Sequence, residues 1–478
     1  MPETIYDVAI IGSGPAGYTA AIRAGQWGLK TALIEKDDKL GGTCLHVGCI
    51  PTKALLFNAE IYEHVQSAKD YGIGGVGKVD VDWSAVQQRK NKVVTKHTKG
   101  LDFLMRKNKV NTIEGHGRLT GPAKDGIHSI EVFTAGGGGA GGESNLVRAR
   151  HVLVATGSEA RMLPGLEPDS RILTNIEILS LDQIPKSLII VGSGAVGVEF
   201  ASIYRSFNAE VTILEMLPRL VPVEDEEVSK ELARAFRKRG IDFHTSANVG
   251  KVERTKDGVA VEFAVEGKGQ RIEGEKVLIA VGRKPNTENV GLELVPNIKT
   301  ERGFIHVDEW MRTGEPGIYA VGDIVAGYPQ LAHAGAMEGI TAIADIAKKP
   351  AKPVNKLHIP GATYCEPQIG SVGLTEAKAR ELGYELKIGK FPFSANSKAS
   401  ILGQHEGFIK IVAEAEYGEV LGVHIIGPSA TELIAESVAA MELEATAEDL
   451  ANTIHAHPTL SEAMLDAANS VYGLAINM

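Results

Sequence analysis

The sequence predicts an α/β protein in which one strand–turn–helix–strand unit occurs twice and a C-terminal α+β region follows. The first observation is a glycine pattern at residues 12–17 that recurs at 192–197, each time directly after an apolar run. The second is a change of character after about residue 357, where strand-like segments precede helices and the repeated unit is absent. A chain of 478 residues is long enough for about two to four domains, each with its own core.

The first copy of the unit begins with residues 5–11, an apolar, β-branched run that is typical of a buried parallel strand. The run leads into Gly12, Gly14 and Gly17, then into a helical pattern and a second strand that ends in Glu35. The glycines permit a tight turn and a close approach of the backbone to a pyrophosphate, whose charge the helix N-terminus stabilises. The carboxylate accepts hydrogen bonds from a ribose. This context predicts a Rossmann-like dinucleotide-binding domain.

The second copy contains Gly192, Gly194 and Gly197, followed by a helix and a strand that ends in Glu215. In both copies 23 positions separate the first glycine from the carboxylate, so we expect two bound dinucleotides. The alternative is that one copy is only structural. A carboxylate at position 215 pairs with a 2′-hydroxyl and repels a 2′-phosphate, which favours NAD over NADP. Arg219 is the one nearby cation that could support NADP.

Cys44 and Cys49, two of the three cysteines, form a candidate redox pair. In a straight helix, Cα atoms five residues apart lie roughly 7.5 Å or more from each other, whereas a disulfide needs about 7 Å or less. A bridge would therefore require a bend, which Gly48 tolerates. Pro51 suits the first turn of a helix starting near Cys49, where unpaired N–H groups favour a thiolate. Two reduced core cysteines or half of a metal site remain alternatives, although further zinc ligands at suitable spacing are missing nearby.

Composition narrows the classes of partner and compartment. The net charge is −10 and the sequence has no evident basic cluster, which argues against nucleic acid or an anionic membrane surface as partner. No signal peptide is evident, and the apolar stretch 188–204 is interrupted by glycines and a glutamate, so no membrane span is expected. Three cysteines do not make a structural disulfide framework, and we expect a reducing, cytoplasmic location. Cys365 is expected to be buried and inert.

Two similar strand-and-turn segments, 152–160 and 277–286, flank the second unit and resemble the two crossings of a hinge around an inserted domain. The glycine-rich segment 135–142 between the first unit and the first crossing predicts a flexible loop, to which we assign no function.

The C-terminal region ends in a segment that contains His455, His457 and Glu462. Because His457 precedes a proline, it should be extended and could project from a turn. Thr459 to Glu462 also fits a helix capping box, which is a purely structural explanation for the glutamate. Farther upstream, residues 431–443 carry an apolar stripe at helical spacing, which is usually core or interface.

These motifs together resemble the FAD-dependent disulfide oxidoreductases over essentially the full chain. Residues 41–53 and 455–462 are most similar to members that oxidise protein-bound dihydrolipoamide in 2-oxo acid dehydrogenase and glycine cleavage complexes. The resemblance implies FAD at the first fingerprint and NAD at the second. It implies a redox disulfide between Cys44 and Cys49, with Cys44 attacked by substrate, and His457 as a base oriented by Glu462, with His455 outside the site.

The resemblance also implies further cofactor contacts. Lys53 and Glu199 are expected to pair beside the flavin ring, and Asp323 to contact the ribityl chain. Other cofactor-binding positions are expected at Gly117, Thr156, Gly157, Ala332, Val249 and Gly282.

The implied domains are an FAD-binding domain at 1–155, an NAD-binding domain at 156–283, a central domain returning to FAD at 284–356 and a dimerisation domain at 357–478. In the expected homodimer, His457 and Glu462 serve the disulfide of the other subunit. A lipoyl-bearing acyltransferase (E2) or a glycine cleavage carrier protein is the expected partner.

Other functions remain as alternatives. A glutathione-type reductase is an alternative, but arginines would be expected where this chain has Glu215. A mercuric reductase would need extra C-terminal cysteines, and a redox-inert flavoprotein scaffold is the alternative outside enzymes.

Overall fold

The computed structural model describes residues 4–134 and 144–477, so the glycine-rich segment 135–142 lies outside the described residues. The chain divides into two compact units. Unit 1 comprises Met1–Ala54, Gln87–Arg161 and Arg283–Val354, and unit 2 comprises Leu55–Val86, Met162–Gly282 and Asn355–Met478. Within residues 4–134 and 144–477, no helix is both long and apolar enough to cross a membrane.

Unit 1 is built on a seven-stranded sheet whose order is β3-β2-β1-β6-β5-β4, with β19 also paired to β6. The strands β3, β2, β1, β6 and β19 pair in parallel, and β5 and β4 continue antiparallel. The strands are β1 (Ile5–Ile11), β2 (Thr31–Glu35), β3 (Asn111–Glu114), β4 (His116–Leu119), β5 (His128–Phe133), β6 (Ser144–Val154) and β19 (Ile318–Ala320). The predicted strand 5–11 and the predicted strand that ends in Glu35 are thus confirmed as neighbours in a parallel sheet.

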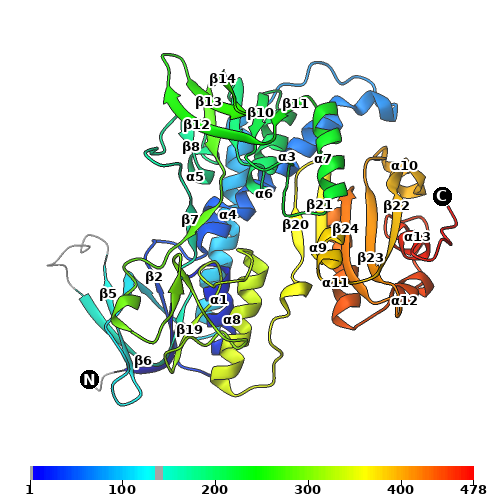
Figure 1. Ribbon diagram of the computed structural model, residues 1–478. Helices are drawn as coiled ribbons and strands as arrows, with labels where there is room; N and C mark the ends of the chain where they lie inside the picture. The colour runs from blue at the N-terminus through cyan, green and yellow to red at the C-terminus, as the bar shows by residue number, and fades with distance from the viewer. Residues whose placement is uncertain (1–3, 135–143, 478) are drawn as a thin grey trace. The chain divides into compact units, whose positions relative to one another are not determined.

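Alternate residues of β1 enter two different hydrophobic clusters. Val8 and Ile10 pack in the cluster that contains α1 residues, whereas Ala9 and Ile11 pack in a second cluster. A strand that is covered on both faces has apolar residues at successive positions, which explains the continuous apolar sequence of β1. The helices α1 (Pro15–Gln26) and α8 (Ala332–Ala347) pack along each other (Figure 1).

The two predicted crossings meet in a small antiparallel ribbon of unit 1. Strand β7 (Ser158–Ala160) pairs with β16 (Arg283–Pro285), and the boundary between units follows β7 and precedes β16. A second pair joins β17 (Thr300–Glu301) to β18 (Phe304–Ile305). Three further helices are α2 (Gly42–Val47), α3 (Cys49–Gln66) and α4 (Trp83–Lys107), of which α3 and α4 span the unit boundary in sequence.

The first part of unit 2 repeats the parallel architecture. Its sheet has the order β11-β10-β9-β15-β8 and is parallel throughout. The strands are β8 (Ile172–Leu173), β9 (Ser187–Val191), β10 (Glu210–Leu214), β11 (Ile241–His244) and β15 (Lys276–Ile279), and the helices are α5 (Asn175–Ile178), α6 (Ala195–Ser206) and α7 (Glu226–Lys238). An antiparallel sheet adds β12 (Ala247–Arg254), β13 (Val259–Val265) and β14 (Lys268–Gly274).

The C-terminal part of unit 2 is an antiparallel sheet in the order β20-β21-β24-β23-β22. Helix α11 packs on β21 and β24, and α13 packs on β22 and β23. The strands are β20 (Gly361–Thr363), β21 (Gln368–Gly373), β22 (Leu386–Pro392), β23 (Phe408–Glu414) and β24 (Val420–Gly427), and the helices are α9 (Glu376–Glu381), α10 (Ser397–Leu402), α11 (Ala430–Glu442), α12 (Ala447–Asn452) and α13 (Glu462–Ser470). The predicted fold class, two Rossmann-like units and a C-terminal α+β region, is confirmed.

Candidate active site

The first glycine fingerprint forms a cradle between β1 and α1. Gly12 has φ +103°, and a Cβ there would lie 2.3 Å from the carbonyl oxygen of Ala155. A Cβ on Gly17 would lie 1.9 Å from the carbonyl oxygen of Gly12. A Cβ on Gly14 would meet nothing within 4 Å, and Gly14 caps α1 without a side-chain hydrogen bond. Two glycines are therefore required by the turn itself, and the third leaves open space at an uncapped helix N-terminus, where a pyrophosphate fits.

The second fingerprint has the same local geometry. Gly192 also has φ +103°, and a Cβ there would lie 2.3 Å from the carbonyl oxygen of Ala280. A Cβ on Gly197 would lie 2.0 Å from the carbonyl oxygen of Gly192, and Gly194 faces open space as the cap of α6. The two predicted dinucleotide sites are therefore equivalent in backbone shape.

Each fingerprint ends at a buried carboxylate with a limited hydrogen-bonding capacity. Glu35 Oε2 accepts hydrogen bonds from Ser13 N (2.8 Å) and Ser13 Oγ (2.6 Å), and its Oε1 accepts one from Asp37 N (3.1 Å). Glu215 repeats this with Ser193 N (2.8 Å), Ser193 Oγ (2.7 Å) and Leu217 N (2.8 Å). A carboxylate has about four acceptor positions, so one on Oε1 remains in each case for a ribose hydroxyl.

The cation that could favour a 2′-phosphate is already engaged. Arg219 Nη2 donates to the carbonyl oxygens of Pro222 (2.9 Å) and Glu224 (3.4 Å). With Arg219 bound to backbone carbonyls and Glu215 held at the end of β10, the second site fits NAD better than NADP.

The cysteine pair lies at a break between two helices, as the spacing predicts. Helix α2 ends at Val47, and α3 begins at Cys49 with Pro51 in its first turn. A Cβ on Gly48 would lie 2.8 Å from the carbonyl oxygen of Thr43 and 3.2 Å from the Cα of Cys44. Only a glycine allows the chain to fold back this closely. Both cysteines are partly buried and are not bridged in this structure.

The two thiols interact electrostatically. A hydrogen bond to Cys49, then burial and the charge of Cys49, raise the pKa of Cys44, while the charge of Lys53 acts in the opposite direction. A proton is thus harder to remove from Cys44 while Cys49 carries a charge. Tyr18 on α1, which sequence reasoning did not single out, lies close enough for both sulfur charges to act on it; burial and those charges raise its pKa. Its position directly after the first fingerprint was the available signal.

A hydrogen-bonded set around Asp323 was also not foreseen from the sequence. Asp323 Oδ2 accepts a short hydrogen bond from Ser158 Oγ. Arg283 donates from Nε to Ser158 Oγ (2.6 Å) and from Nη2 to Ser158 O (2.5 Å), and it lies 3.7 Å from Asp323. Burial lowers the pKa of Arg283, although the charges of Asp323 and Cys49 act to raise it. These contacts fix Asp323 and place a guanidinium beside it, which a cofactor carrying phosphate charge can use.

His457 and Glu462 are brought together as predicted. His457 lies outside helices and is 71% exposed, and its Nδ1 is 2.9 Å from Glu462 Oε1. Glu462 Oε2 accepts a hydrogen bond from Thr459 N (2.8 Å). Burial acts to raise the pKa of Glu462, but the Thr459 N–H and His457 lower it overall. The two oxygens of Glu462 therefore contact the histidine and the Thr459 N–H separately. The reciprocal bond of the predicted capping box is not formed, because Thr459 Oγ1 donates to Ala456 O (2.7 Å) and α13 begins after Ser461.

His455 forms a separate pair. Its Nε2 is 2.7 Å from Glu436 Oε1 on α11, and its Nδ1 is 2.9 Å from the carbonyl oxygen of Thr453. Its side chain is only 6% exposed. His455 thus anchors the segment that carries His457, consistent with its exclusion from the predicted site.

The remaining predicted positions have diverse surroundings. Gly157 (φ +69°) and Gly282 (φ +113°) face open space, which suits close approach of a ligand. Thr156 Oγ1 donates to the carbonyl oxygen of Asn286 (2.6 Å). Glu199 is buried on α6 and accepts a hydrogen bond from Tyr364 N (2.9 Å). Ala332 begins α8, Gly117 lies on β4 and Val249 lies on β12. The pairing of Lys53 with Glu199 and the cofactor contacts of these residues stay predictions.

Comparisons with known proteins agree with this geometry. Residues 6–339 match the family described as pyridine nucleotide-disulphide oxidoreductase, and residues 359–468 match its dimerisation domain. The chain is 45% identical to a dihydrolipoyl dehydrogenase of Rhizobium etli and 44% identical to one of Bacillus subtilis, covering 99% of both chains in each case. A solved structure, LpdA from Mycobacterium tuberculosis, superposes with a TM-score of 0.89 at 29% identity, covering 97% of this chain and 99% of that one.

The fold and the cysteine pair define a flavoprotein oxidoreductase that exchanges electrons with a pyridine nucleotide. The chain belongs to the pyridine nucleotide-disulphide oxidoreductases. Its cofactors are FAD and NAD, and both fingerprints fit a dinucleotide.

Proposed function

We propose that this protein is a dihydrolipoyl dehydrogenase, which oxidises a protein-bound dihydrolipoyl group and reduces NAD⁺. The observation that carries the proposal is the Cys44–Cys49 pair, held in hydrogen-bonding contact by the turn at Gly48. The full-length similarity to proteins named dihydrolipoyl dehydrogenase gives the substrate class. The glutathione-type alternative is not favoured, because the second fingerprint ends in Glu215 rather than in arginine.

The reaction uses the oxidised form of the cysteine pair. One substrate thiol transfers its proton to His457 and attacks Sγ of Cys44, which breaks the Cys44–Cys49 bond and leaves Cys49 as a thiolate. The second substrate thiol then attacks the substrate sulfur of the mixed disulfide and closes the lipoyl ring, and its proton passes to Cys44 as the Cys44–substrate bond breaks. The raised pKa of Cys44 supports this distribution, because Cys44 ends as the thiol and Cys49 keeps the charge. FAD, when bound, carries the electron pair from the cysteines to NAD⁺.

His457 is suited to proton transfer because Glu462 holds Nδ1 and leaves Nε2 directed away from that carboxylate. Its 71% exposure is unusual for a base that must act in a water-poor site. We propose that a homodimer resolves this, with His457 and Glu462 of each subunit serving the disulfide of the other. Both residues fall within the region that matches the dimerisation domain. A dilution series of activity against mass tests this, since an active monomer would contradict a shared site.

The substrate would be carried by a lipoyl-bearing E2 or by the carrier protein of glycine cleavage, and we expect the enzyme to act in the cytoplasm. The first experiment is steady-state reduction of NAD⁺ and NADP⁺ by dihydrolipoamide with FAD-loaded protein. Rapid turnover with NAD⁺ and little with NADP⁺ is expected. Turnover of glutathione disulfide by NADPH, without dihydrolipoamide activity, would overturn the assignment. Cys44→Ser should abolish lipoamide turnover, whereas an inert scaffold would show no such activity to lose.

A further inference from the structure

Helix α4 carries a row of lysines that the proposed reaction does not use. Lys92, Lys96 and Lys99 are all exposed and lie at spacings of four and three residues, so they share one face of the helix. Together with Gln88, Asn91 and Thr95 they line a hollow on the surface. We call Lys92, Lys96 and Lys99 the α4 lysine face. With Arg89 and Lys90 they make five cations within residues 89–99 and no acidic residue, so the expectation that the sequence has no basic cluster is wrong for this segment.

The α4 lysine face is unusual for this protein. Several other helix cations are paired with a carboxylate one turn away, as in Lys230–Glu226 (3.1 Å) and Arg380–Glu376 (2.8 Å). No Asp or Glu occurs between Asp82 and Asp102. Among the described residues, none of the three lysines takes part in an ion pair. Like charges at these spacings destabilise a helix, so the arrangement is not explained by the stability of the fold.

We propose that the α4 lysine face is the docking surface for an acidic face of the protein that carries the dihydrolipoyl group. The inference rests on the proposed function. Residues 87–107 of α4 belong to the same compact unit as Cys44 and Cys49, so a carrier bound there is held on the unit that contains the disulfide. A carrier-borne substrate must arrive and leave at every turnover, and complementary charge raises the association rate without requiring tight binding.

The net charge of the chain favours an acidic protein over nucleic acid as the occupant. At −10 the remainder of the surface repels polyanions, so a docking partner needs a local positive face. Three lysines spread over about 10 Å of helix can meet a few carboxylates on a folded domain. Proteins that bind nucleic acid through its backbone typically neutralise about six to ten phosphates, which this face cannot supply.

The test compares two substrates in K92E/K96E/K99E. Glutamate and lysine have similar helix propensities, and each like-charged neighbour pair is replaced by another, so the helix should persist. The probe is an isolated lipoyl domain of net negative charge, loaded with dihydrolipoyl-lysine, and free dihydrolipoamide is the second substrate. With the lipoyl domain as substrate, the variant's kcat/KM should be about tenfold or more below that of the wild type at about 0.01 M ionic strength. At about 0.5 M the variant and the wild type should differ by less than about twofold. With free dihydrolipoamide it should be unchanged.

The matched control is K124E/K349E/K352E, which makes the same charge change at exposed lysines elsewhere in unit 1. This control should retain kcat/KM for the lipoyl domain within about twofold. An equal loss in both triple variants would overturn the proposal, because total charge would then explain the effect. So would unchanged turnover of the domain by K92E/K96E/K99E, an equal loss with free dihydrolipoamide, or binding of duplex DNA to the face with carrier turnover unaffected. Failure of the wild-type enzyme on free dihydrolipoamide would instead refute the proposed function.

Discussion

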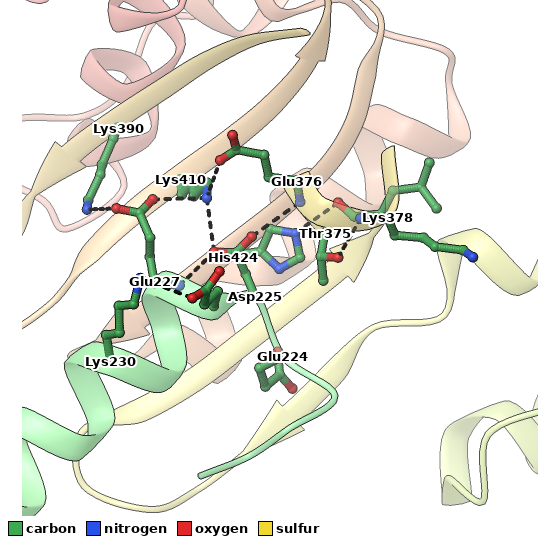
Figure 2. Close-up of polar contacts among 12 residues, drawn as sticks. Glu224, Asp225, Glu227, Lys230, Thr375, Glu376, Lys378, Lys390, Lys410 and His424 are labelled. Atoms are coloured by element: carbon green, nitrogen blue, oxygen red, sulfur yellow. Dashed lines mark hydrogen bonds and ion pairs between the residues drawn. The ribbon is translucent and has the colours of Figure 1, made fainter. Parts of the chain in front are cut away.

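Replacing Lys410 by methionine should destabilise unit 2 through a charge left buried without its counter-ion. Lys410 on β23 is 2% exposed, and its Nζ contacts Asp225 Oδ1 (3.0 Å), Glu227 Oε2 (2.9 Å) and Glu376 Oε2 (2.8 Å) (Figure 2). Burial acts to lower the pKa of Lys410, but hydrogen bonds to the three carboxylates raise it above its ordinary value. Methionine fills a similar volume and removes only the ammonium.

The loss in the free energy of unfolding depends on which hydrogen bonds each carboxylate keeps after the substitution. Asp225 is 2% exposed and keeps hydrogen bonds from the backbone N–H groups of Glu227 (3.0 Å) and Glu376 (3.2 Å). Glu227 and Glu376 are 38% and 28% exposed and can be hydrated. Removing one partner of a buried pair costs about 3–5 kcal/mol. The retained bonds and partial hydration place Lys410→Met near the lower end, at about 3 kcal/mol, which corresponds to a fall in Tm of about 5 °C for a unit of this size.

Thermal unfolding of the FAD-loaded protein measures this loss. Lys390→Met is the matched control, because Lys390 lies on the neighbouring strand β22, is 41% exposed and contacts only Glu227 among these carboxylates (2.6 Å). Its loss should stay below about 1 kcal/mol. Adding Asp225→Asn to Lys410→Met should recover part of the stability by removing the stranded charge. The reasoning fails if Lys410→Met costs no more than Lys390→Met, or if the added Asp225→Asn makes the protein still less stable.

Three further predictions concern titration and the active site. Burial raises the pKa of Glu366 from 4.5 to about 7, so between these pH values the folded chain holds a proton that the unfolded chain has released. The free energy of unfolding should therefore fall by up to about 3 kcal/mol as pH rises through this window. Glu366→Gln should reduce this dependence on pH when unfolding is measured at about pH 5 and pH 8. An equal pH dependence in the variant and the wild type would contradict the prediction. Glu462→Gln should lower dihydrolipoamide turnover about 100-fold by releasing the orientation of His457, while NADH still reduces the bound flavin; loss of both activities would point to a structural defect instead. Glu215→Gln removes the charge that repels a 2′-phosphate and should reduce the NAD⁺ over NADP⁺ preference in kcat/KM about tenfold or more, with an unchanged ratio as the contrary result.

The parts of the site that the sequence predicted are those fixed by local chain geometry. The fingerprints follow from glycines that a turn requires, and the bend between Cys44 and Cys49 follows from helix spacing. His457 and Glu462 are five residues apart, and their contact was expected from the resemblance of residues 455–462 to a known family. In each case the interacting groups are close in sequence or belong to a motif of fixed spacing.

The missed features depend on contacts between distant segments. Arg283 and Ser158 are 125 positions apart, and each looks like an ordinary polar residue at the end of a strand. Lys410 meets Asp225 across 185 positions, and neither residue signals a buried charge by itself. Such pairs are determined by which strands become neighbours, and that information is not contained in the local periodicity of either segment.

The two fingerprints show why local motifs alone do not assign a cofactor. Their glycine geometry and their serine–glutamate hydrogen bonds are nearly identical, so neither cradle distinguishes one dinucleotide from another. The two sites differ in the residues that surround each fingerprint. Unit 1 adds the Ser158–Asp323–Arg283 set and the cysteine pair, of which Cys49 acts on Arg283 through its charge. The second fingerprint instead has an arginine, Arg219, that is bound to backbone carbonyls. Within residues 4–134 and 144–477, a cysteine pair accompanies the first cradle and not the second, which supports our proposal that the redox chemistry takes place at the first site.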